Sequence, residues 1–328
     1  MRIFDETWLA ENPDRPVILA LRALKLGDIL VAVPALKAIR RTYPDHAFVL
    51  AVPRWLEPIV ELIGGVDALL PTPGLNDLLP VPPGRIDIAV NLHGNGPESR
   101  RIVEALEPRV IMGHKNETYD GPEWEDGVLE RYRWARIVTW HGMPADPDDV
   151  ALQAPAVPSA APGAILVHVG AFYGSRHWPT ERFAAVASAL REEGHTVLFT
   201  GSAAERARAE EVARLGGFDD DSVLAGEIAL DEFAALIREA RVVVSADTGA
   251  AHLASAYAVP SVVLFGPAPV EEWGPPTTGP HITLTDASKR VGDAFAATPD
   301  PAILAVTVDD VLEAVHSLSL DRAEVPTP

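Results

Sequence analysis

The segment Asp247-Thr248-Gly249-Ala250-Ala251-His252 is the strongest candidate for chemistry in the 328-residue chain. It follows the apolar run VVVSA and opens a helical pattern, so its N–H groups would lie at a helix N-terminus, which favours a diphosphate. Gly249 would let such a ligand approach the backbone, and Thr248 and His252 could add hydrogen bonds. Asp247 is acceptor-only and would suit sugar hydroxyls. The alternative is that Asp247 or Thr248 only caps the helix and His252 packs within it.

A second candidate is HVGAFYGSRHWPTERF, residues 168–183. A predicted strand ends in a glycine-bearing loop, and a helix follows from Pro179, a residue that suits the first helical turn. Ser175 and the Arg176 guanidinium could hold phosphate oxygens by charge-assisted hydrogen bonds. The alternative is a loop that Trp178 anchors to the core, with Arg176 in solvent.

The third candidate is LRALKLGDILVAVPALKAIRRTYP, residues 21–44. Gly27 permits a tight turn over residues 25–28, and Asp28 lies where the chain becomes helical. Asp28 could cap that helix as its N-cap residue. It could instead remove a proton from an acceptor hydroxyl, as a general base does.

Strands that alternate with helical patterns must position these residues, and this alternation predicts parallel sheets. A segment rich in Pro, Ala and Asp, residues 142–163, predicts a linker between two domains, 1–150 and 151–328. We therefore expect an α/β protein with two Rossmann-like domains. The predicted strands are 17–24, 48–53, 66–71, 86–92 and 110–114 in the first domain, and 164–170, 195–201, 242–247 and 261–266 in the second.

Composition argues against several kinds of partner. The formal net charge is −20, and residues 1–155 carry 16 basic against 23 acidic side chains. Such a charge repels nucleic acid and anionic membranes. There is no cysteine, and no apolar run is long enough to span a bilayer. We expect a cytoplasmic protein. The acidic groups at 146–148 and 219–221 fit solvated loops better than metal sites.

The three candidate segments together resemble glycosyltransferase family 9, the ADP-heptose:lipopolysaccharide heptosyltransferase family. The resemblance covers roughly residues 17–318. It rests on the order and spacing of five motifs in this sequence. These are Arg22 to Asp28, NLHGNG at 91–96, Gly170 to Pro179, Asp247 to His252, and Phe265-Gly266-Pro267.

This resemblance implies a GT-B fold, with its two domains facing across a cleft, and an inverting, metal-independent transfer. The expected reaction moves a heptose-like sugar from a nucleotide-diphosphate sugar, ADP-heptose by the resemblance, to a carbohydrate or glycoside acceptor. No cofactor is expected, because the nucleotide sugar is a substrate. Asp28 would be the catalytic base, with Gly27, His93 and Asn95 on the acceptor side. The donor residues would be Gly170, Ser175, Arg176, Glu205, Ile228, Asp247, Thr248, Gly249 and His252.

The acceptor is where we expect a departure from the family. The stretch 71–87 contains Arg85 as its only basic residue, and the N-terminal half is acidic. A strongly anionic acceptor such as lipopolysaccharide is therefore disfavoured. Two other functions stay open. A nucleotide-sugar 2-epimerase would release free epimerised sugar without an acceptor, and a non-catalytic nucleotide-sugar-binding protein would not depend on Asp28.

Overall fold

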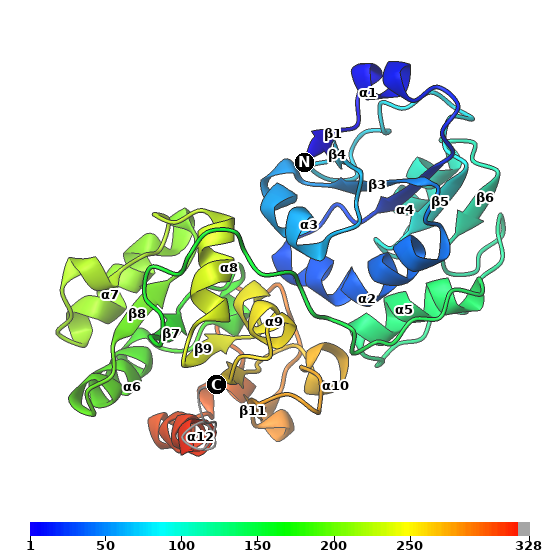
Figure 1. Ribbon diagram of the computed structural model, residues 1–328. Helices are drawn as coiled ribbons and strands as arrows, with labels where there is room; N and C mark the ends of the chain where they lie inside the picture. Colours follow the sequence, from blue (N-terminus) through cyan, green and yellow to red (C-terminus); the bar gives the residue numbers. More distant parts are fainter. Residues whose placement is uncertain (321–328) are drawn as a thin grey trace. The chain divides into compact units, whose positions relative to one another are not determined.

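The computed structural model describes residues 1–320, and the chain divides into two compact units between Gln153 and Ala154 (Figure 1). The segment 142–163 contains no helix or strand. Its first part is bound to the first unit, because the Asp149 carboxylate pairs with Lys37 Nζ at 2.5 Å and Arg41 Nη1 at 2.9 Å. Each unit is described by itself below.

The first unit is built on a six-stranded sheet in which every pair of strands is parallel, in the order β1-β4-β3-β2-β5-β6. The two central strands, β2 and β3, are buried along their whole length, which explains their continuous apolar sequence. The strands are β1 (Arg2–Ile3), β2 (Val17–Leu21), β3 (Ala47–Val52), β4 (Ala68–Pro71), β5 (Ile88–Asn91) and β6 (Val110–Met112).

Helices cover both faces of this sheet. Trp8 of α1 and Ile102 of α4 share one apolar cluster with Val17 and Leu19 of β2. Helices α2 and α5 lie side by side against the other face (Figure 1). The helices are α1 (Glu6–Glu11), α2 (Leu26–Thr42), α3 (Glu57–Ile63), α4 (Pro97–Glu104) and α5 (Glu130–Trp140).

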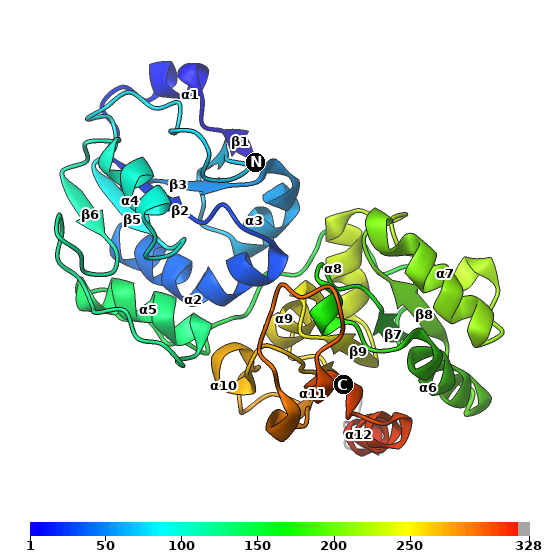
Figure 2. The same cartoon turned by 180° about the vertical axis from the view of Figure 1, so that it is seen from behind.

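The second unit has a five-stranded parallel sheet in the order β11-β10-β9-β7-β8. Helices α6, α7 and α12 contribute to the large apolar cluster on one face, while Ala251 of α9 packs on Val263 and Phe265 on the other. Figure 2 shows α6 and α7 beside β8, seen from behind. The strands are β7 (Ile165–His168), β8 (Val197–Thr200), β9 (Val242–Ala246), β10 (Ser261–Leu264) and β11 (His281–Leu284), and the helices are α6 (Thr180–Glu192), α7 (Arg206–Leu215), α8 (Leu230–Arg238), α9 (Gly249–Ala256), α10 (Val270–Trp273), α11 (Pro301–Leu304) and α12 (Val308–Leu320).

The predicted α/β class with two Rossmann-like sheets is confirmed. The nine predicted strands exist; eight are shorter than predicted, and β3 has the predicted length but begins one residue earlier. Two further strands, β1 and β11, were not predicted, because β1 has two residues and β11 is only half-buried. The predicted turn at 25–28 is wrong: α2 begins at Leu26, so Gly27 is helical and its φ is not positive.

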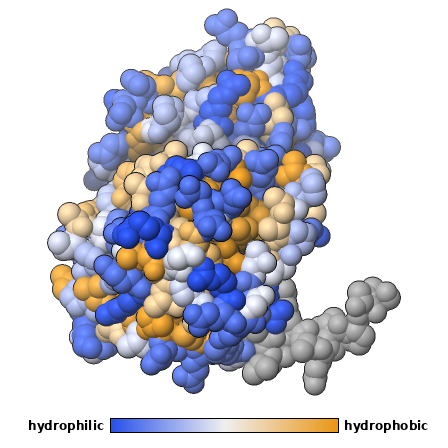
Figure 3. Space-filling model, turned by 90° about the vertical axis from the view of Figure 1, so that its left-hand side faces the viewer, coloured by the Kyte–Doolittle hydropathy of each residue, from blue (hydrophilic) through white to orange (hydrophobic). Residues whose placement is uncertain are grey.

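Hydrophilic and hydrophobic residues alternate over the face drawn in Figure 3, which is the usual surface of a globular protein. Within residues 1–320, we find no helix that combines the length and the apolar character needed to cross a bilayer.

Candidate active site

In the second unit, the two predicted donor segments meet at the point where the strand order reverses. β7 pairs with β8 on one side and with β9 on the other. The chain therefore leaves β7 and β9 in opposite directions, which opens a crevice at their carboxyl ends. The loop 169–179 follows β7, and Asp247 and Thr248 follow β9. Open α/β sheets bind ligands at such a crevice.

A buried ion pair joins these two loops. Arg176 Nη1 lies 3.2 Å from Asp247 Oδ2 and also donates to the Asp247 carbonyl oxygen at 3.0 Å. His252 Nε2, one turn into α9, lies 3.6 Å from Asp247 Oδ1. Asp247 is 2% exposed. The predicted residues Arg176, Asp247 and His252 are thus one cluster, and the alternative that Arg176 is solvated is wrong.

Thr248 occupies the N-cap position of α9, but its side chain makes no capping hydrogen bond. Its hydroxyl is buried, and within the described residues Oγ1 has no hydrogen-bond partner. A buried hydroxyl without a partner costs free energy. The first N–H groups of a helix, here from Gly249, also have no partner inside it. Both features leave room for hydrogen bonds to a ligand oxygen at this helix N-terminus.

The loop that carries Arg176 is held in place by its own backbone and by Ser175. Ser175 is fully buried, and its hydroxyl donates to Ala294 O at 2.8 Å, while its N–H donates to Ala296 O at 2.9 Å. Gly174 allows this packing, because a Cβ there would lie 1.9 Å from Ala297 O. The Ser175 hydroxyl therefore shapes the loop. Trp178 anchors the same loop, as its alternative predicted, with Nε1 donating to Val306 O at 3.0 Å.

Gly170 and Glu205 are neighbours at the other side of this loop. A Cβ on Gly170 would lie 2.2 Å from Glu205 Oε2, so only glycine allows the carboxylate to come this close. The same oxygen accepts from the Ser202 N–H at 2.7 Å and from the Ser202 hydroxyl at 2.8 Å. Ile228 lies in the half-buried loop before α8, which is bonded to this region through Gly226 N–H and Gly201 O.

The first unit has its own reversal point, between β2 and β5. Asp28 follows β2 and is the third residue of α2, where Oδ2 accepts from the Lys25 N–H at 3.2 Å. The alternative that Asp28 is the N-cap residue is therefore wrong in position, although the carboxylate does help to cap the helix. Its side chain is 25% exposed, so it remains open to solvent or to a substrate.

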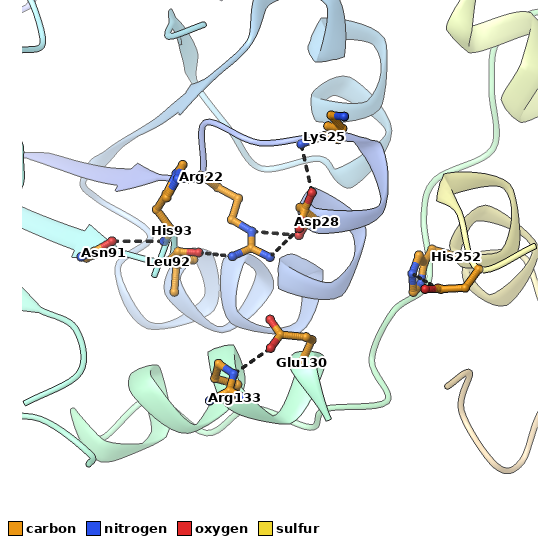
Figure 4. A network of polar contacts seen from close by, with 10 residues as sticks. Arg22, Lys25, Asp28, Asn91, Leu92, His93, Glu130, Arg133 and His252 are labelled. Carbon is orange, nitrogen blue, oxygen red and sulfur yellow. Dashed lines mark hydrogen bonds and ion pairs between the residues drawn. The ribbon is translucent and has the colours of Figure 1, made fainter. Parts of the chain in front are cut away.

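Arg22, the residue directly after β2, is the buried partner of Asp28 (Figure 4). Its Nε donates to Asp28 O at 2.9 Å, and Nη2 lies 3.7 Å from Asp28 Oδ1. Its Nη1 donates to Leu92 O, at the end of β5. The guanidinium also lies 4.3 Å from the ring centroid of Trp134 on α5. Burial lowers the pKa of Arg22, and the charges of Asp28 and Glu130 oppose that change.

His93 and Asn95 lie in the loop after β5, on the same side of the sheet as Asp28. The His93 N–H donates to Asn91 Oδ1 at 3.1 Å, and its Nδ1 is buried with no hydrogen-bond partner in the part of the chain described. Burial, together with the positive charge of Arg22, lowers the pKa of His93 to about 4. Asn95 Oδ1 accepts from Arg100 Nη2 at 2.7 Å, so it orients α4.

A pocket of about 530 Å³ lies between α4 and the loop 115–123. It adjoins the His93 loop through the Asn95–Arg100 contact. Three basic and three acidic side chains line it, so the lining carries no net charge. The lining residues are Pro97, Arg100, Arg101, Glu104, Lys115, Asn116, Glu117, Thr118 and Glu123.

A pH-dependent loss of stability follows from His114, which is 1% exposed and packs between Trp124 and Trp134. Burial lowers its pKa to about 4, from 6.5 in an unfolded chain. The unfolded state therefore binds the proton first as the pH falls, and stability is lost between about pH 6.5 and 4. At about 1.4 kcal/mol per pKa unit, the loss reaches about 3 kcal/mol. His114→Asn should remove this part of the pH dependence in thermal melts; an unchanged slope would contradict the assignment.

The acidic groups considered for metal binding have other partners or are exposed. Asp148 pairs with Arg131 Nε at 2.7 Å, and 219–221 form an exposed turn. Among the residues described here, we find no cluster of three or more His, Cys, Asp or Glu side chains placed to hold a metal ion.

Arg22 and Trp134 are the site residues whose roles the sequence did not reveal. A signal was present for Arg22, since an arginine that follows a fully buried strand needs a buried partner. No comparable signal marks Trp134. It lies on α5 and contacts Arg22 because α5 packs against α2, a tertiary contact that the sequence does not indicate.

The fold is that of the GT-B class, with two doubly wound parallel sheets. It matches the solved structure of ADP-heptose lipopolysaccharide heptosyltransferase II from Escherichia coli, with a TM-score of 0.74, 20% identity, and coverage of 94% of this chain and 99% of that one. A family 9 glycosyltransferase from Veillonella parvula aligns with a TM-score of 0.72 and 16% identity, over 94% and 98% of the two chains.

Sequence comparison finds a resemblance to the same family over part of the chain. Residues 138–290 match the model of glycosyltransferase family 9 (heptosyltransferase). Lipopolysaccharide heptosyltransferase 1 of Pseudomonas aeruginosa is 35% identical over 150 residues, 44% of this chain and 41% of that protein. Lipopolysaccharide heptosyltransferase 2 of Escherichia coli is 30% identical over 160 residues, 47% and 46% of the two chains. The chain thus spans less than half the length of these curated relatives, and the resemblance to family 9 is confirmed.

Proposed function

We propose that this chain is an inverting, metal-independent glycosyltransferase. It transfers a heptose-like sugar from a nucleotide-diphosphate sugar, ADP-heptose being the first donor to test, to an acceptor hydroxyl. The observation that carries this proposal is the cluster of Arg176, Asp247, Thr248 and His252 at the N-terminus of α9. That cluster lies at the reversal point of the sheet and inside the region that matches family 9.

The donor diphosphate would be held by groups of this chain. The N–H groups at the start of α9, the Thr248 hydroxyl and the Arg176 guanidinium are all donors, and two of these three carry positive charge or a positive dipole end. Asp247 is already paired with Arg176, so its second role would be to accept from a sugar hydroxyl. Charge neutralisation by arginine and a helix N-terminus is the basis for proposing that no divalent cation is needed.

The chemical step follows from an acceptor hydroxyl and a leaving nucleoside diphosphate. The acceptor oxygen forms a bond to the anomeric carbon as the bond from that carbon to the phosphate oxygen breaks, which inverts the configuration. The acceptor proton goes to the Asp28 carboxylate, whose side chain is accessible beside the loop of His93 and Asn95. The nucleoside diphosphate leaves with the bonding electron pair.

The acceptor we propose is a carbohydrate or glycoside without strong negative charge. The pocket beside the His93 loop is lined by equal numbers of acidic and basic side chains. Residues 1–155 carry a net charge of −7, from 16 basic and 23 acidic side chains. An acceptor bearing several phosphates would be repelled by the unit as a whole.

Donor binding gives the first prediction. ADP should bind in the presence of EDTA, and His252→Ala should weaken binding by about 1–3 kcal/mol if His252 donates to a charged oxygen. The measurement is isothermal titration calorimetry. His316→Ala is the matched control, because His316 is an exposed histidine of α12 paired with Glu193. Binding that disappears with the metal would contradict the metal-independent proposal.

Turnover separates the competing functions. ADP-, GDP-, UDP- and dTDP-sugars should be incubated with and without a panel of neutral glycosides, and nucleoside diphosphate release followed. A transferase releases the nucleoside diphosphate of its donor only when an acceptor is present. Release of epimerised sugar without an acceptor would indicate a 2-epimerase, and tight binding with no release under any condition would indicate a binding protein.

A further inference from the structure

We propose that Arg22 is a positioning residue that fixes the Asp28 base and the His93 loop relative to each other. This inference rests on the proposed function, because it concerns the geometry of the proposed base. It assigns a task to a side chain whose guanidinium contacts two loops at once.

The contacts of Arg22 connect the two strand ends at the reversal point of the first sheet. Nε donates to the carbonyl oxygen of Asp28, after β2, and Nη1 donates to the carbonyl oxygen of Leu92, after β5. These strands are neighbours in the sheet, but Arg22 and Leu92 are 70 residues apart in the sequence. The Leu92 N–H also donates to the carbonyl oxygen of Leu21 at the end of β2 at 3.1 Å, and the Arg22 guanidinium adds side-chain bonds that reach both loops.

Burial makes the contacts of Arg22 rigid. The side chain is 1% exposed, and the guanidinium carbon lies over the Trp134 ring, 4.3 Å from its centroid. A desolvated guanidinium needs its hydrogen bonds satisfied, since a buried donor without a partner is costly. Asp28 O, Leu92 O and the Asp28 carboxylate provide those partners, so displacement of either loop would cost free energy.

The charge of Arg22 acts on the predicted base, Asp28, and on His93, one of the predicted acceptor-side residues. It lies 3.7 Å from the Asp28 carboxylate, and its positive charge disfavours protonation of His93. His93 would therefore face the acceptor as a neutral imidazole, able to accept or donate one hydrogen bond. Lysine could supply the charge, but not the planar arrangement of donors that reaches both carbonyl oxygens.

The chain offers a matched control in Arg133. It is also a buried arginine, 4% exposed, paired with Glu130 Oε1 at 2.7 Å and stacked on an indole, with its guanidinium carbon 4.0 Å from the Trp124 ring centroid. Arg133 contacts Glu130, Glu125 and Trp124, and among the residues the structure describes we find no contact of its side chain with Asp28 or with the loop after β5. A purely structural need for a buried, stacked arginine would affect both positions alike.

The test compares Arg22→Lys with Arg133→Lys in the full chain. We expect Arg22→Lys to lower kcat by about 10²-fold with the donor KM unchanged, since a displacement of the base by about 1 Å has an effect of that size. Arg133→Lys should keep a kcat close to that of the wild type. Dilute guanidinium chloride should restore part of the turnover of Arg22→Ala, with sodium chloride as the ionic-strength control. Equal kcat losses in both lysine variants, or no restoration by guanidinium, would overturn the proposal.

A substrate-free measurement keeps this inference separate from the proposed function. Melting temperatures of Arg22→Lys, Asp28→Asn and the double variant form a cycle, and coupling should make the double variant lose less than the sum of the single losses. Additive losses would overturn the Arg22–Asp28 link, even if no donor is turned over. Coupling without turnover by the wild type would refute the transferase and retain the link.

Discussion

Asp28→Asn is expected to lower turnover by about 10²–10⁴-fold, the usual effect of removing a general base. Asparagine keeps the size of the side chain and an oxygen that can accept from the Lys25 N–H, so the start of α2 should be retained. The proposed proton acceptor is lost, while the proposed donor site belongs to the other unit and should bind ADP as before. Turnover, ADP affinity and melting temperature are the three measurements.

Glu232→Gln is the control for this substitution. Glu232 is likewise the third residue of a helix, α8, and its carboxylate accepts from the Ala229 N–H at 2.7 Å. Asp28→Asn should melt lower than Glu232→Gln, because it also removes the negative charge that faces the buried Arg22, and only Asp28→Asn should lose turnover. If Asp28→Asn melts lower but turns over normally, the carboxylate is only a helix cap and the base lies elsewhere.

Arg176→Met should destabilise the second unit by about 3 kcal/mol, because it leaves the buried Asp247 carboxylate without its cation. Breaking a buried ion pair typically costs about 3–5 kcal/mol, and the lower end applies because Arg176 is 24% exposed. Chemical denaturation of the full chain measures the loss. The same variant should bind ADP more weakly, since the guanidinium is one of the proposed phosphate ligands.

The double variant Arg176→Met/Asp247→Asn tests the cause of that loss. Removing both charges leaves no buried ion, so most of the lost stability should return, whereas ADP affinity should not. A double variant as unstable as Arg176→Met would mean that the arginine stabilises the loop through its bond to the Asp247 carbonyl oxygen instead.

Strand positions and sheet class could be predicted because apolar runs such as 17–21 and 242–246 are buried on both faces. The motif at 247–252 could be placed at a helix start because it directly follows the second of these apolar runs and opens a helical pattern. Tertiary contacts were out of reach. The Arg176–Asp247 pair joins residues 71 positions apart, and whether Asp28 is the N-cap or the third residue of its helix depends on bonds that Arg22 and Lys25 make.

Residues 294–297 lie beyond the region that matches the family model, and their contacts limit how the sequence of related chains can vary there. Ala294 and Ala296 hold Ser175 through their carbonyl oxygens, and Gly174 fits against the carbonyl of Ala297. Backbone groups are common to every amino acid, so side chains in this stretch can change while the loop of Arg176 keeps its shape. The number of residues in this stretch cannot change in the same way, because inserting or deleting one residue would move every carbonyl oxygen away from its partner. Related chains should therefore differ in sequence here and agree in spacing.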